Sequence, residues 1–91
     1  MVYVSMRVTV ADFAKWREVF DGSEAIRRAA GATGVSQLFR DVDDPNTITL
    51  VLEWDGAEHA RAFLDDPALR ERQQKAGTIG APAVRAIMTR A

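Results

Sequence analysis

The chain has 91 residues, of which 47% are hydrophobic and 27% are charged, and its formal net charge is −1. This length fits a single domain over residues 1–91, and the composition argues against disorder. The near-neutral charge argues against nucleic acid and anionic membranes as partners, and the absence of cysteine excludes disulfides and a thiol nucleophile. We find no signal peptide and no apolar run of the ~18 residues that a membrane span needs, so we expect a cytoplasmic protein.

Residues 2–10 alternate between two faces, which is typical of a β-strand. One face is wholly apolar, and the other carries polar or amphipathic side chains. The apolar set is Val2, Val4, Met6, Val8 and Val10, and the opposite set is Tyr3, Ser5, Arg7 and Thr9.

A helix is expected to follow, with Asp12 as its N-cap and Gly31 as its stop. Gly22 lies inside this segment, so a break near residues 21–23 is compatible with the pattern. The predicted apolar stripe consists of Phe13, Trp16, Val19 or Phe20, Ser23, Ile26 and Ala30, and the charged residues expected outside it include Arg27.

Residues 35–54 predict a β-hairpin, because two apolar-rich runs flank a turn that contains Pro45. The sequence does not determine the register in which the two strands of this hairpin pair. A five-residue loop over 42–46 would place Phe39 on the side of Thr49 and Val51, whereas a loop one residue shorter would place Leu38 there.

Two short helices and a final strand are expected after the hairpin. Asp55 is a plausible N-cap for the first helix, and Asp66 followed by Pro67 is a typical start for the second. A loop over 80–82 and a strand over 83–90 would complete the chain.

The resulting order, β-α-β-β-α(α)-β, predicts an α+β, ferredoxin-like fold with a four-stranded antiparallel sheet and helices on one face. The other face would be too apolar for water, so we expect a homodimer in which two sheets close a barrel. This open face would carry Tyr3, Ser5, Arg7, Thr49, Val51, Glu53, Arg85, Ile87 and, in one register, Phe39.

Three segments carry a resemblance that spans nearly the whole chain. They are KWREVFD (15–21), RDVDDPNTITLVLEW (40–54) and EHARAFLDDPALRERQQKAG (58–77). Together they resemble the dimeric α/β barrel superfamily, specifically small proteins similar to antibiotic biosynthesis monooxygenases. The resemblance implies a homodimer with a cavity, between sheet and helices or inside the barrel, that takes small and often aromatic molecules without a cofactor.

The chain departs from the residue sets that the resemblance implies. Cofactor-free oxygenases of this kind use Asn, Trp, Tyr and Arg, but the sole asparagine here is Asn46, in the hairpin turn. Haem-degrading members use Asn, Trp and His. This chain has Trp54 and His59, but Ser5 and Arg7 stand where an asparagine would be wanted.

We therefore predict a set of ligand-binding residues and no metal ligand, and we leave the catalytic residues unassigned. Arg7 could hold a ligand oxygen together with Arg85, or it could pair with Glu53 across the sheet. Tyr3 could donate a proton or stack on an aromatic ring, or simply pack. His59 could act as a general base, or be an exposed helix histidine. The predicted ligand-binding set is Tyr3, Arg7, Phe39, Glu53, His59 and Arg85.

Two functions are compatible with these features. The first is a cofactor-independent monooxygenase or cyclase acting on a small aromatic or polyketide-like molecule, and the second is a non-catalytic homodimer that binds a small ligand. RNA-recognition domains share the element order, but they need stacked aromatic and basic residues on the open face. Val51 and Glu53 stand in that place here, which argues against RNA.

Overall fold

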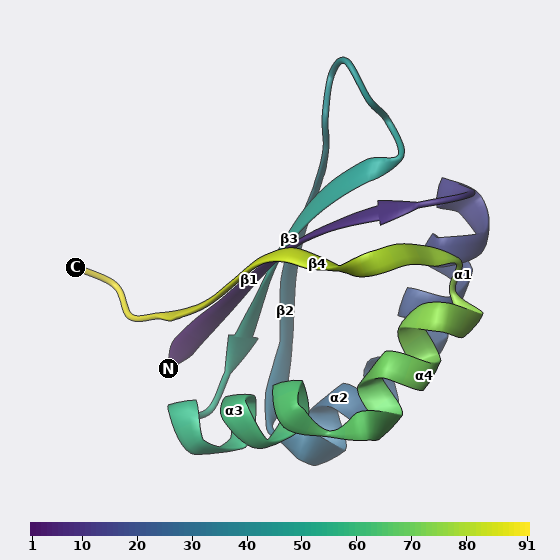
Figure 1. Ribbon diagram of the computed structural model, residues 1–91. Coiled ribbons are helices and arrows are strands. Elements are labelled where there is room, and N and C mark those ends of the chain that lie inside the picture. The colour runs from purple at the N-terminus through teal and green to yellow at the C-terminus, as the bar shows by residue number, and fades with distance from the viewer.

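The computed structural model describes the backbone of residues 1–91 and the side chains of all residues outside 81–85. The strands form one antiparallel sheet in the order β2-β3-β1-β4, and the helices gather on one side of it (Figure 1). The predicted ferredoxin-like α+β fold is confirmed. The elements are β1 (Val2–Val10), α1 (Phe13–Gly22), α2 (Glu24–Ala30), β2 (Ala32–Arg40), β3 (Thr47–Trp54), α3 (Ala57–Asp65), α4 (Pro67–Lys75) and β4 (Thr78–Met88).

The core lies between the sheet and the helices. The predicted apolar face of β1 is buried, and its register sets Val4 opposite Leu52 and Met6 opposite Leu50 on β3. Trp54 is 1% exposed, and its ring centroid lies 4.9 Å from that of Phe63 on α3. Burial of a large apolar side chain contributes about 1.5–3 kcal/mol, so this layer is the main source of stability.

Capping residues define the first helical segment as the sequence predicted. The side chain of Asp12 accepts a hydrogen bond from the backbone N–H of Lys15 at 3.3 Å. Ser23 separates α1 from α2, and its hydroxyl donates to the carbonyl of Val19 at 2.8 Å. Gly31 ends α2 with φ of 126°, a conformation that favours glycine.

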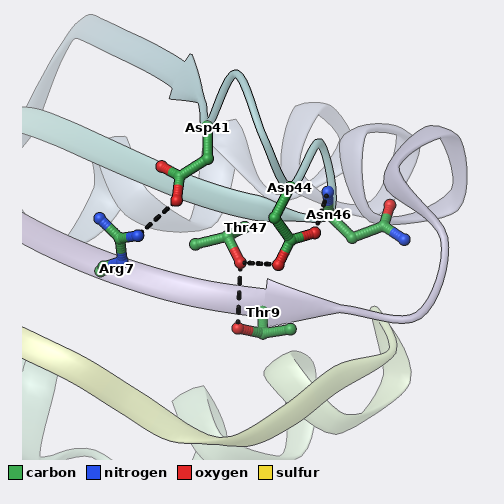
Figure 2. A network of polar contacts seen from close by, with 6 residues as sticks. All are labelled: Arg7, Thr9, Asp41, Asp44, Asn46 and Thr47. Atoms are coloured by element: carbon green, nitrogen blue, oxygen red, sulfur yellow. Dashed lines mark hydrogen bonds and ion pairs between the residues drawn. The ribbon is translucent and has the colours of Figure 1, made fainter.

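The hairpin between β2 and β3 adopts the five-residue alternative. Phe39 pairs with Thr49, and the backbone N–H of Asp41 donates to the carbonyl of Thr47. The turn is held by Asp44, which accepts from the N–H of Asn46 at 3.2 Å and from the hydroxyl of Thr47 at 2.7 Å (Figure 2).

This turn is joined to β1 by a backbone hydrogen bond, from the N–H of Val10 to the carbonyl of Asn46 at 2.9 Å, and by two side-chain contacts. The hydroxyls of Thr9 and Thr47 lie 3.4 Å apart, and Arg7 forms an ion pair with Asp41 (Figure 2). Within the part of the chain that the structure describes, no group of three or more acidic or histidine side chains is placed to hold a metal ion. Asp44 and Asp41 are hydrogen-bond and ion-pair acceptors that hold the hairpin in place.

Two sequence predictions in the second half of the chain are wrong in detail. The N-cap of α3 is Gly56, because the carboxylate of Asp55 is bonded to the ring of His59 instead of to the helix backbone. The strand β4 begins at Thr78, so residues 80–82 are not a loop.

The face of β4 also differs from the prediction. Ile87 pairs with Val4 and packs against the core, whereas Ala86 and Met88 pair with Ser5 and Tyr3 on the open side. Both alternating sets of this strand contain apolar residues, so pairing with β1 decides the phase. A register shift between Arg7 and Thr9 interrupts that pairing.

A hydrocarbon-spanning segment would need a long, uninterrupted apolar helix. None of the helices in the described chain meets that requirement.

Candidate functional site

A pocket of about 70 Å³ lies between the sheet and the helices. Aliphatic side chains of β1 and β3 form its floor, among them Met6 and Leu50. Trp16 and Phe20 of α1 form an aromatic wall, with ring centroids 5.1 Å apart and a 22° angle between the ring planes. They stand four residues apart on one helix, which brings them to the same face. The pocket is therefore suited to a flat apolar ring.

The polar groups of this pocket come mainly from α2, α4 and the start of β4. Arg72 and Gln73 of α4 line it, and the guanidinium of Arg72 lies 5.3 Å from the ring centroid of Phe63. The Thr78 hydroxyl also belongs to a lining residue; it is buried and has no hydrogen-bond partner among the described residues. A buried hydroxyl without a hydrogen-bond partner is unfavourable, so a hydrogen bond from this hydroxyl to a ligand would favour binding.

Arg27 is the charged residue buried most deeply beside this pocket, with 9% of its surface exposed. It donates a hydrogen bond to the carbonyl of Phe20 at 2.9 Å, and its guanidinium lies 3.9 Å above the Phe20 ring. Burial lowers the pKa of Arg27, because the charged form loses contact with water.

The sequence prediction for Arg27 is wrong, since it placed this residue outside the apolar stripe and placed Ile26 within it. The structure exposes 46% of Ile26 and buries Arg27. Arg27 follows Phe20 by about two helical turns, so the two residues share one face despite their different polarity. A charged residue at the helical spacing of an aromatic stripe is the signal that would have revealed it.

A second pocket of about 220 Å³ also has Arg27 in its lining. It is more polar than the first, and Asp21, Glu24 and Arg28 contribute to its walls. The edge strand β2 closes it near Gly34, where the register with β3 shifts between Ala32 and Ser36.

The open face of the sheet carries four of the six predicted ligand-binding residues, namely Tyr3, Arg7, Phe39 and Glu53. Tyr3 and Glu53 line a hollow of about 280 Å³. The hydroxyl of Tyr3 accepts a hydrogen bond from Arg90 at 3.0 Å, which raises the pKa of Arg90. Thr33 donates to the carboxylate of Glu53 at 2.8 Å. Phe39 lies on the same face, with 54% of its surface exposed.

Arg7 also points to the open face, but its partner is Asp41 and not Glu53. The cross-sheet pairing considered for Arg7 and Glu53 is thus replaced by two separate contacts.

The two remaining predicted residues are placed differently. His59 lies on α3, in the helical layer, where its Nδ1 is 2.9 Å from a carboxylate oxygen of Asp55. It is exposed and stands apart from the open face. The side chain of Arg85 falls outside the described residues. That any of the six binds a ligand stays a prediction.

No family model matches the sequence, and no curated protein does. Solved structures do match. A Bordetella bronchiseptica protein assigned to the antibiotic biosynthesis monooxygenases has a TM-score of 0.79 at 14% identity, over 99% of this chain and 96% of that one. SnoaB, a cofactor-independent oxygenase from Streptomyces nogalater, has a TM-score of 0.73 at 20% identity, over 99% of this chain and 92% of that one. A Caulobacter crescentus protein that is also assigned to the antibiotic biosynthesis monooxygenases has a TM-score of 0.71 at 18% identity. The match covers 99% of this chain and 89% of that one.

These similarities establish the fold along nearly the whole chain. The protein has the ferredoxin-like fold of the antibiotic biosynthesis monooxygenase-like proteins, and the resemblance seen in the sequence is confirmed at that level.

Proposed function

We propose that this protein is a homodimeric, cofactor-independent monooxygenase- or cyclase-like enzyme that takes a small aromatic or polyketide-like molecule into the pocket between sheet and helices. The observation that supports the proposal is the make-up of this pocket. Aromatic and aliphatic side chains form its walls, and Arg27 and Arg72 bring two guanidinium groups to it. This combination suits a ring that carries oxygen atoms.

The chemistry follows from the need for electrons. An oxygenase that works without a cofactor must draw electrons from its substrate, so the substrate has to be an electron-rich phenol or enol. Such a molecule reacts through its ionised form, in which negative charge develops on oxygen. A guanidinium beside a partly dehydrated pocket stabilises that charge. Arg72 is the residue that we propose for this role, because it is less buried than Arg27 and lines the pocket beside the Phe63 ring.

The alternative is a non-catalytic binding protein, and one observation favours it. Among the described residues that line the pocket there is no histidine and no carboxylate to act as a base. His59, the residue predicted for that role, lies elsewhere on α3. An enzyme would then need a substrate that ionises in water before it binds.

Substitution of Arg72 separates the two functions. We expect oxygen uptake with a panel of dihydroxybenzenes, and an Arg72→Gln variant should lower kcat about tenfold, which is about 1.4 kcal/mol of transition-state stabilisation. Arg70→Gln, on the exposed side of the same helix, is the matched control and should leave the rate unchanged. Binding of panel members without oxygen uptake would instead support the binding protein.

The exposed apolar residues on the open face of the sheet are the basis for the proposed homodimer. Val35, Phe39 and Met88 expose between 39% and 56% of their surface, and the central Val51 lies among them. A second copy packed sheet to sheet would cover these groups and the hollow beside Tyr3. The same contact would add stability to a domain of this small size.

A charge at the centre of this face should break the dimer. We expect the unmodified protein to sediment at twice the mass of one chain at micromolar concentration, and Val51→Lys to weaken association at least about tenfold, because it buries an unpaired ammonium. Ala62→Lys, on the exposed surface of α3, should sediment like the unmodified protein. A monomeric parent protein in analytical ultracentrifugation would refute the barrel.

A further inference from the structure

Arg27 occupies an unusual place, because it lines two pockets at once. One is the apolar pocket, and the other is the more polar pocket that residues of α1, α2 and β2 line. Phe20 and Leu52 also line both, so the two pockets adjoin at Arg27. A molecule with its ring against Trp16 would therefore end close to this cation.

The charge of Arg27 has no counterion among the described residues. The ion pairs of the described chain involve other cations, and the one hydrogen bond of the Arg27 guanidinium goes to the neutral carbonyl of Phe20. Asp21 and Glu24 attract it only from a distance, while Arg72 repels it. A buried charge without a hydrogen-bonded counterion is unfavourable, and such sites are usually completed by an anion.

The shape and surroundings of the site restrict that anion. A guanidinium presents a planar fork of N–H donors, and a carboxylate matches this fork with two parallel hydrogen bonds. The polar pocket is bordered by Asp21 and Glu24, whose charges would repel a doubly charged phosphate about twice as strongly as a singly charged carboxylate. The adjoining apolar walls favour an attached ring over a free ion. These features together select a planar organic monoanion.

We infer that Arg27 is the anchor for the carboxylate of an aromatic acid, whose ring lies in the apolar pocket against Trp16 and whose carboxylate lies where the two pockets meet. This deepens the proposed function, on whose pocket it rests, by naming the ligand class as aryl carboxylates. Arg27 binds and orients the ligand, whereas Arg72 is the residue proposed to face the reacting oxygen.

The test compares benzoate with benzamide, which have nearly the same shape and differ in charge. One ring is chosen because the apolar pocket measures only about 70 Å³. Titration calorimetry on the full-length protein should show benzoate binding at least about tenfold more tightly than benzamide. Arg27→Gln should remove this preference, Arg27→Lys should keep part of it, and Arg61→Gln on the surface of α3 should keep all of it.

Equal affinities for benzoate and benzamide would overturn the inference, and so would an unchanged benzoate affinity in Arg27→Gln. Cooperative thermal unfolding of each variant shows that it folds, and chemical-shift changes at Trp16 report where the probe binds. Arg27-dependent benzoate binding without oxygen uptake from any dihydroxyarene would support this site while refuting the enzyme. Oxygen uptake that is unaffected by Arg27→Gln, together with no preference for benzoate over benzamide, would support the enzyme while refuting the carboxylate site.

Discussion

Replacing Gly31 with alanine is expected to lower the free energy of unfolding by about 3 kcal/mol. Two causes add. Gly31 has φ of 126°, which L-residues with a side chain rarely adopt. A Cβ at this position would also lie 2.9 Å from the Cβ of His59 and 2.9 Å from a carboxylate oxygen of Asp55. The Cβ of His59 is fixed to the α3 backbone, so rotation of a side chain cannot relieve that contact.

The strain would be transmitted to the connection between β3 and α3. The carbonyl of Gly31 accepts the backbone N–H of Asp55 at 2.9 Å, and this bond holds the end of α2 against the start of α3. A displaced α3 would move Phe63 and loosen its contact with Trp54. We expect a fall in Tm of more than about 10 °C, measured by circular dichroism at fixed protein concentration.

Gly22→Ala is the matched control for this substitution. Gly22 is the last residue of α1, it is not among the glycines with positive φ, and a Cβ there would meet no atom within 4 Å. Alanine should therefore raise the free energy of unfolding by about 0.5–1 kcal/mol, since it reduces the freedom of the unfolded chain. Equal effects of the two substitutions would show that the geometry of Gly31 is not the cause.

The sequence predicted the elements whose pattern has a local cause. The alternation in residues 2–10 and 47–54 revealed β1 and β3, because both strands lie in the middle of the sheet with one face buried. Asp12 and Asp66 each accept a backbone hydrogen bond at a helix start, as expected from their position. These features depend on neighbours within a few residues.

The errors arose where two nearby groups compete for one side chain, or where a distant segment decides the outcome. Asp55 has two available partners, and the ring of His59 competes with the helix backbone for its carboxylate. The faces of β4 depend on pairing with β1 and on the register shift in that pairing. Periodicity within one segment contains no information about either choice.

The candidate site was the least predictable part. Its pocket is assembled from both central strands and all four described helices, and no motif marks it. The open-face residues Tyr3, Arg7 and Glu53 could be grouped in advance because strand alternation assigns faces, whereas the face of Phe39 depended on the hairpin register. Arg27 was missed because its charge was taken as evidence of exposure, although helical spacing places it beside Phe20.

Replacing Arg27 with methionine is expected to raise the free energy of unfolding of the ligand-free protein by about 2 kcal/mol. The lowered pKa of Arg27 means that the folded chain binds this proton less tightly than the unfolded chain. Its charge therefore opposes folding at every pH below the folded pKa, neutral pH included. Methionine fills a similar space without a charge, and the carbonyl of Phe20 keeps the N–H of Ser23 as a partner at 3.2 Å.

Urea denaturation without ligand should show this gain as a higher midpoint with an unchanged slope. Arg28→Met, at the exposed neighbouring position of α2, should change the free energy of unfolding by less than about 0.5 kcal/mol. If Arg27→Met instead destabilised the protein, the guanidinium would have to serve as a brace between α2 and the end of α1 through Phe20. A gain in stability that accompanies loss of benzoate binding would mean that Arg27 opposes the empty fold and is stabilised only by an anion.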